Sequence, residues 1–216
     1  MRTSRNNIGS RRASLLTDKN HFRLPYIWKA SAMQVIQTGL PEVLIVEPQL
    51  FGDERGFFLE TYQLDRYVAH GISRPFVQDN LSRSRFGVVR GLHLQNPRCQ
   101  GKLVSVVRGR ILDVTVDVRV GSPNFGRHVA VELSEENRRQ LWVPRGFAHG
   151  FAVLSETADC FYKCDDTYSP KDEIVVRWDD PAIGVAWCLE RPSLAPRDAT
   201  APLLSDIKNL PVYGQV

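Results

Sequence analysis

The sequence predicts an all-β protein with the architecture of a double-sheet jelly roll or a small barrel. Short runs rich in Val, Ile and aromatic residues follow one another from residue 33 onward, separated by Gly, Pro, Asn and Asp. Runs with the period of an amphipathic helix are scarce. The 216 residues are 43% hydrophobic and 24% charged, which is ordinary for a globular domain with its own core. Many short strands with few helices are typical of these two architectures.

The predicted strands begin at residues 43–51, a β-rich run that ends at a turn-like segment, 52–56. The clearest strand is 111–120, in which apolar side chains from Leu112 to Val120 alternate with Asp, Thr and Arg. Further strands are predicted at 102–110, 128–133, 139–144, 150–154, 159–164 and 173–178. Two short helices are expected, at 61–70 and 203–210.

The first 32 residues differ in composition from the rest of the chain. They hold seven basic side chains against one acid, Asp18, and show no sustained period. Because the whole chain has a net charge of +4, residues 33–216 have a net charge of −2. We therefore predict a flexible basic extension at 1–32 and one folded domain at 33–216. The mildly acidic domain gives no reason to expect a nucleic-acid partner.

Composition and motifs exclude several classes of protein. Four cysteines in this length are too few for a disulfide scaffold, so they are expected to be reduced structural thiols: Cys99, Cys160, Cys164 and Cys188. No run approaches the roughly 18 apolar residues of a membrane helix, and no secretory signal is visible. A cytoplasmic location without a membrane partner is therefore expected. The motifs of nicotinamide-binding and P-loop enzymes are absent from the sequence.

Residues 90–95 (RGLHLQ) place a titratable side chain on a predicted core strand. Leu92 and Leu94 share one face, and His93 and Gln95 share the other. A histidine in this setting can be a hydrogen-bonded core residue, or it can act as a general base near neutral pH. This segment alone leaves both interpretations open.

A second histidine, His149, lies in a glycine-rich run that would otherwise be read as a bulge or a tight turn. Together with His93 it could form half of a metal site. However, Gln95 and Arg98 stand where further ligands would be needed, so no metal is expected. Tyr162 is either a core residue or a proton donor. Inward His, Tyr, Lys and Arg side chains suit proton abstraction beside a carbonyl of an anionic substrate. They do not identify the substrate.

From Met33 to about Leu204 the chain resembles the dTDP-4-dehydrorhamnose 3,5-epimerases. The similarity rests on many segments in the family's order: VLIVEPQLFGDERGFFLETY, FVQDNLSRSRFGVVRGLHLQ, QGKLVSVVRG, DVTVDVRVGSPNFGRHVAVELSEENRRQLWVPRGFAHGFAVLSE, YKCDDTYSP and RDATAPLL. The resemblance implies a cupin-type jelly roll with short flanking helices and a homodimer that shares strands across its interface. It also implies a dTDP-sugar substrate and neither a metal nor an organic cofactor.

The resemblance implies roles for individual residues. The four expected catalytic residues are the general base His93, its carboxylate partner Asp198, the acid Tyr162 and the enolate-stabilising cation Lys102. The expected substrate contacts are Phe51, Arg55, Glu60, Gln78, Asp79, Asn80, Arg90, His149, Tyr168, Glu173 and Arg197. The family commonly has Lys where Arg197 stands, a change that keeps the charge and alters the hydrogen-bond geometry.

The implied reaction is epimerisation of dTDP-4-keto-6-deoxy-D-glucose at carbons 3 and 5. The ketone at carbon 4 acidifies both neighbouring positions. A base removes one proton, a cation stabilises the enolate, and an acid returns a proton to the opposite face. Two such cycles give dTDP-4-keto-L-rhamnose. Two alternatives stay open: an epimerase acting on one carbon of a dTDP-keto sugar, and a non-catalytic nucleotide-sugar binding module.

Overall fold

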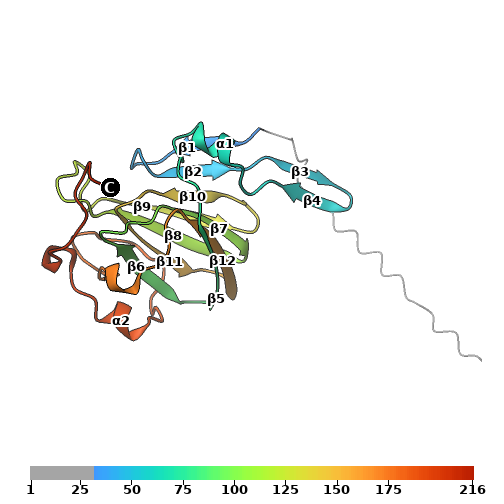
Figure 1. Ribbon diagram of the computed structural model, residues 1–216. Helices are drawn as coiled ribbons and strands as arrows, with labels where there is room; N and C mark the ends of the chain where they lie inside the picture. The colour runs from blue at the N-terminus through green and yellow to red at the C-terminus, as the bar shows by residue number, and fades with distance from the viewer. Residues whose placement is uncertain (1–31) are drawn as a thin grey trace, which may run out of the picture.

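The computed structural model describes residues 32–216 and confirms the all-β jelly roll, in which two antiparallel sheets lie face to face (Figure 1). The expected extension lies, apart from its last residue, outside the described residues. Among residues 32–216 no helix is long and apolar enough to span a bilayer. All four cysteines are unpaired, as expected, and only Cys188 is exposed.

Most neighbouring strands within each sheet come from distant parts of the chain; the exceptions are β1 with β2 and β8 with β9. In spatial order, the six-stranded sheet consists of β1 (Gln34–Gln37), β2 (Leu44–Glu47), β10 (Gln140–Val143), β7 (Lys102–Arg108), β12 (Thr157–Cys164) and β5 (Gln78–Arg85). The five-stranded sheet consists, in the same way, of β13 (Glu173–Val175), β6 (Val89–Gln95), β11 (Phe147–Val153), β8 (Arg110–Asp117) and β9 (His128–Ser134). A separate hairpin pairs β3 (Leu50–Asp53) with β4 (Gly56–Leu59).

A hydrophobic core fills much of the space between the two sheets. Val104 and Leu141 of the six-stranded sheet belong to one buried cluster with Leu133, Phe147 and Phe151 of the five-stranded sheet. Burial of apolar side chains from both sheets is the main stabilising contribution to such a sandwich. This core occupies only part of the interior, and polar side chains share the rest.

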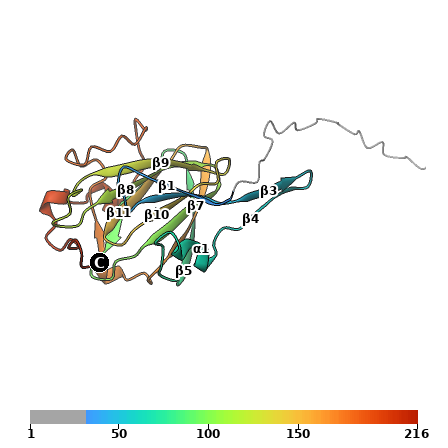
Figure 2. The same ribbon diagram turned by 90° about the horizontal axis from the view of Figure 1, so that it is seen from above.

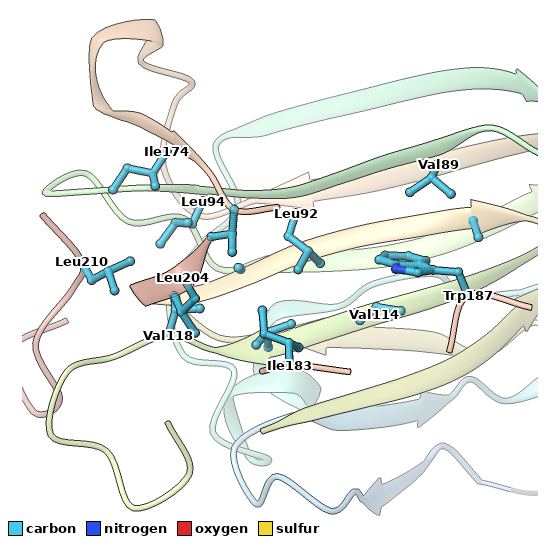
Figure 3. Packing of buried hydrophobic residues seen from close by; sticks show 14 residues of the cluster. Val89, Leu92, Leu94, Val114, Val118, Ile174, Ile183, Trp187, Leu204 and Leu210 are labelled. Atoms are coloured by element: carbon cyan, nitrogen blue, oxygen red, sulfur yellow. The ribbon is translucent and has the colours of Figure 1, made fainter. Parts of the chain in front are cut away.

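Strand β8 confirms the predicted alternation and shows which face points inward. Val114 of β8 and Val118, which directly follows the strand, lie on the outer face of the sheet, where they pack with Ile183 and Trp187 of the carboxyl-terminal segment (Figure 3). The apolar face of β8 is therefore buried outside the sandwich. Its polar face points between the two sheets, where Asp113, Thr115 and Asp117 are fully buried.

The helices are shorter than the sequence predicts. Helix α1 (Leu64–Val68) falls within the expected 61–70, and its Tyr67 hydroxyl donates to Gln140 Oε1 at 2.6 Å on the six-stranded sheet. The helix expected at 203–210 is only a 3-10 turn, η2 (Leu204–Asp206), and a further 3-10 turn, η1, spans Pro170–Asp172. Helix α2 (Pro196–Ala199) has no counterpart among the predicted elements.

The β3–β4 hairpin projects away from the two-sheet body in both views (Figures 1 and 2). The sequence predicts one strand at 43–51, but this run divides at Pro48 between β2 and β3. Phe51, Phe57 and Phe58 on the hairpin are 47%, 57% and 67% exposed. Three exposed aromatic side chains on a two-stranded ribbon form an uncovered apolar surface.

Candidate active site

A cavity of about 300 Å³ lies between the two sheets, and both sheets contribute to its wall. The six-stranded sheet contributes Gln78 and Asn80 of β5, Lys102 of β7 and Tyr162 of β12. Tyr162 is paired with Asn80, and Cys164 is paired with both Gln78 and Lys102. Paired residues and every second residue along a strand share a face, which explains why these side chains all point inward.

Asp79 lies on the opposite face of β5 from its two neighbours. Its carboxylate accepts a hydrogen bond from Lys163 Nζ at 2.8 Å, and it does not line the cavity. Strand alternation alone separates Asp79 from Gln78 and Asn80. Its expected contact with substrate stays a prediction.

The five-stranded sheet and the segments beside it form the other wall. Its contributions include His93 of β6, Glu173 of β13, Tyr168 from the preceding loop and Arg197 of α2. Glu173 is paired with Gln95, two residues beyond His93, so that all three side chains share the inner face. The predicted separation of His93 from its leucine neighbours is confirmed, because Leu92 and Leu94 belong to the core on the outer face.

His93 and Asp198 form a hydrogen-bonded pair at this wall. His93 Nε2 lies 2.8 Å from Asp198 Oδ1, and the two side chains are 21% and 2% exposed. An ionised carboxylate only accepts hydrogen bonds, so Nε2 carries the proton of this contact and Nδ1 is the basic nitrogen. Burial opposes the charge of Asp198, but hydrogen bonds from His93 and Gly91 hold its pKa below the ordinary value.

Gly91 makes this arrangement sterically feasible. Its backbone N–H donates to Asp198 Oδ2 at 3.3 Å, and its φ of +122° is a conformation that other residues rarely adopt. A Cβ atom at Gly91 would lie 2.5 Å from the Cα atom of Gly150 on β11. The glycines therefore allow β6 and β11 to approach closely beside the His93–Asp198 pair.

Tyr162 and Lys102 have polar atoms free to contact a ligand. Neither the Tyr162 hydroxyl nor the Lys102 ammonium has a hydrogen-bond partner among residues 32–216. Burial raises the pKa of Tyr162 to about 12, so the phenol keeps its proton at neutral pH. Burial lowers the pKa of Lys102, while nearby Cys164, Asp113 and Glu173 work in the opposite direction.

His149 forms a second histidine–aspartate pair next to the first. Its Nε2 lies 2.9 Å from both carboxylate oxygens of Asp113, and the side chains are 8% and 0% exposed. Burial raises the pKa of Asp113, although His149 and Lys102 oppose that rise. His149 is paired with His93 in the sheet, but it does not line the 300 Å³ cavity.

Arg90 lies beside a smaller cavity of about 230 Å³, which His93, Arg197 and Asp198 also line. Its Nε donates to Ser84 Oγ at 3.0 Å, and the side chain is exposed. His93 therefore has space on two sides, one containing Tyr162 and Lys102 and the other containing Arg90. Among the described residues, no group of three or more His, Cys, Asp or Glu side chains could hold a metal ion.

Comparisons with known proteins identify the family of this chain. The model of the family described as dTDP-4-dehydrorhamnose 3,5-epimerase matches residues 37–206. The chain belongs to this epimerase family. A curated dTDP-4-dehydrorhamnose 3,5-epimerase from Salmonella typhimurium is 51% identical over 175 residues, which are 80% of this chain and 96% of that protein.

Two further relatives of this epimerase carry information about substrate. The crystal structure of a Legionella pneumophila dTDP-6-deoxy-D-glucose-3,5-epimerase in complex with dTDP-4-keto-L-rhamnose is 52% identical. It has a TM-score of 0.83 and covers 84% of this chain and 99% of its own. A dTDP-4-dehydrorhamnose 3-epimerase from Streptomyces niveus is 39% identical over 188 residues, covering 84% of this chain and 90% of that protein.

Besides Asp79, Arg90 and His149, three more of the residues expected to bind substrate lie outside the 300 Å³ cavity. Phe51 and Arg55 line a hollow on the projecting hairpin, and Glu60, which follows the hairpin, pairs with Arg66 at 3.1 Å. Arg55 is highly exposed, and among residues 32–216 it pairs only with its neighbour Asp53. Their expected roles stay predictions, which require that another copy of the hairpin approach this cavity.

Asp113 is a buried polar residue near the site. The sequence pattern did not assign Asp113 to the site. The alternation at 111–120 placed it on a polar face, but it did not show that this face points between the sheets. Gln100 also lines the cavity and its amide donates to the Asp166 carbonyl oxygen at 2.8 Å. It lies in a loop where no periodic pattern could have shown its direction.

Proposed function

We propose that this protein inverts carbons 3 and 5 of dTDP-4-keto-6-deoxy-D-glucose and forms dTDP-4-keto-L-rhamnose. The observation that carries the proposal is a base and an acid on opposite sheets of one cavity. His93, paired with Asp198, is on the five-stranded sheet, and Tyr162 is on the six-stranded sheet. Inversion needs this arrangement, because the proton must leave from one face of the sugar and return to the other.

Each residue has one task in this reaction. His93 Nδ1 takes the proton from the carbon next to the ketone, and the electron pair moves onto the carbonyl oxygen to form an enolate. The Lys102 ammonium faces this oxygen and stabilises its charge in a site of low polarity. Tyr162 then donates its proton to the opposite face of the same carbon. Before the next cycle His93 releases the abstracted proton to solvent, and the Tyr162 phenolate takes up a proton from solvent. Asp198 holds the imidazole in the required tautomer.

The number of carbons inverted is the point on which the relatives differ. This chain is 51% identical to the S. typhimurium 3,5-epimerase and 39% identical to the S. niveus 3-epimerase, which supports the double reaction. Turnover in deuterated water tests it. Deuterium at both carbons of the product is expected. Label at carbon 3 or carbon 5 alone would establish a single-carbon epimerase, and dTDP binding without label would establish a binding module.

We further propose that the enzyme is a homodimer in which each hairpin reaches the other subunit. Phe57 and Phe58 are exposed, and so are both members of the Arg55–Asp53 ion pair, which supports an occupied surface on this hairpin. Sedimentation equilibrium is expected to give twice the mass of the chain, and Phe57→Ser/Phe58→Ser is expected to shift it toward the monomer. A monomeric wild type would overturn the proposal. The expected cytoplasmic location stays a prediction.

A further inference from the structure

Arg197 connects two carboxylates at the wall of the cavity. Its Nη1 donates to Glu173 Oε2 at 2.7 Å, and its Nε lies 3.5 Å from Asp198 Oδ1. The same Glu173 oxygen accepts from the Tyr168 hydroxyl at 3.1 Å, and the same Asp198 oxygen contacts His93. A continuous chain of polar contacts therefore runs from Tyr168 to the expected base.

The position of Arg197 in this chain makes its charge significant. Its side chain is 52% exposed, whereas Glu173 is 16% and Asp198 2% exposed. Burial works against the charge of Arg197, but Glu173, Tyr168 and Asp198 hold its pKa above the ordinary value. The guanidinium stays charged at every accessible pH, so it acts on its neighbours as a fixed positive charge.

The charged and titratable groups around His93 come from several elements and one loop. They are Asp198 and Arg197 of α2, Glu173 of β13, Tyr168 of the preceding loop, Lys102 of β7, Tyr162 of β12, Arg90 of β6 itself, and the His149–Asp113 pair of β11 and β8. Two of these groups form an ion pair with Asp198 within residues 32–216: His93 and Arg197. Arg197 is therefore the one permanent cation that contacts this carboxylate among the described residues.

The consequence for catalysis follows from the signs of these charges. Asp198 stabilises the protonated form of His93, whereas Arg197 destabilises it and shares the carboxylate. A histidine must be neutral to take a proton from carbon. The positive charge of Arg197 therefore favours the neutral form of His93. Glu173 holds the guanidinium and limits how closely it approaches Asp198.

We propose that Arg197, anchored by Glu173, is a positioning residue that sets the acidic limit of the pH range in which the His93–Asp198 pair works. The inference rests on the proposed epimerase function. It differs from a substrate contact, because a residue that only binds substrate would change KM without moving the pH range. It also differs from a purely structural role, which would lower kcat equally at all pH values.

The test is the pH dependence of kcat/KM for four variants. In Arg197→Gln, the pH of half-maximal kcat/KM on the acidic side is expected to rise by about 0.5 to 1 unit, because one partly screened charge is lost. Arg197→Lys keeps the charge and is expected to stay close to the wild-type value. Glu173→Gln is expected to lower the pH of half-maximal kcat/KM, because the guanidinium then faces Asp198 without a second carboxylate to hold it. The matched control Arg177→Gln removes an exposed arginine that pairs with Asp179 away from the cavity, and no shift is expected.

The double variant Arg197→Gln/Glu173→Gln distinguishes anchoring from a direct effect of Glu173 on the base. If Glu173 acts through Arg197, the double variant keeps the profile of Arg197→Gln. Two shifts that cancel would overturn the anchoring step, and an unmoved profile in Arg197→Gln would overturn the whole inference. An NMR titration of the His93 ring gives the same shift without turnover. Wild-type protein that does not turn over would instead refute the epimerase function.

Discussion

Two histidine–aspartate pairs lie side by side on the inner face of the five-stranded sheet, and only one of them borders the cavity. His93 of β6 and His149 of β11 are directly paired across the sheet. His93 is 21% exposed and lines both cavities, whereas His149 is 8% exposed and lines neither. Contact with a carboxylate is common to both histidines. Access to the cavity therefore separates the expected base from its enclosed neighbour.

The partners of the two pairs differ in the same way. Asp198 lies in the short helix α2, contacts His93 and accepts a second hydrogen bond from the Gly91 N–H. Both oxygens of Asp113 lie within hydrogen-bond distance of His149 Nε2, inside the sheet sandwich. The first pair can exchange a proton with a ligand, while the second pair balances buried charge close to Lys102. Substitutions at equivalent positions should therefore affect activity in one pair and stability in the other.

Loss of the cavity-lining histidine, His93, should have the largest effect. His93→Ala is expected to lower kcat about 10³-fold or more, equivalent to about 4 kcal/mol in the activation free energy, because the variant lacks the proposed general base. Deuterium incorporation should disappear while dTDP binding, measured by calorimetry, is retained. Substantial residual exchange would mean that another group is the base.

Loss of the enclosed histidine should be seen in stability. His149→Ala leaves Asp113 buried without its partner, which costs about 3–5 kcal/mol in the free energy of unfolding. Thermal unfolding should show a fall in Tm of at least about 6 °C, compared with a much smaller change in His93→Ala. Equal Tm values for the two variants would show that the pairs do not differ as their burial indicates.

Lys102 links the two pairs, because it lines the cavity and interacts electrostatically with Asp113. Lys102→Met keeps the length of the side chain and removes the charge that would face the enolate. A fall in kcat of about 10²–10³-fold is expected, with KM little changed, as for loss of one preorganised donor to an oxyanion. A large rise in KM with unchanged kcat would assign Lys102 to ground-state binding.

Tyr162 is on the sheet that faces the His93–Asp198 pair. Loss of its hydroxyl should therefore separate proton removal from reprotonation. Tyr162→Phe is expected to lower epimerisation about 10²-fold and to reduce initial proton loss less, because His93 and Lys102 remain. Deuterium wash-in without inversion is the signature to measure by NMR. Unchanged epimerisation would mean that another group or water supplies the proton.

The two histidine–aspartate pairs also show how much of the site can be predicted from the sequence. The period-two pattern at 111–120 predicted the alternation of β8 correctly, but not its inner face, because that depends on segment 177–210 covering the valines. The RGLHLQ run placed His93 opposite its leucines. Its partner Asp198 lies 105 residues away on a four-residue helix without any period, so only the family resemblance indicated it. Long-range contacts of this kind leave no local signal.

The smallest expected effect is a change of stability with pH, which has opposite signs for Asp198 and Asp113. The lowered pKa of Asp198 means that its ionised form adds stability above pH 3.8, and this contribution is lost as the pH falls through the lowered value. The raised pKa of Asp113 means the reverse: the folded state holds its proton more tightly, so stability declines as the pH rises from 3.8. Relative to wild type, Asp198→Asn should therefore become more destabilising with rising pH, and Asp113→Asn should become less destabilising. Urea unfolding between pH 3 and 6 measures both differences, and slopes of the same sign would show that the two carboxylates experience similar environments.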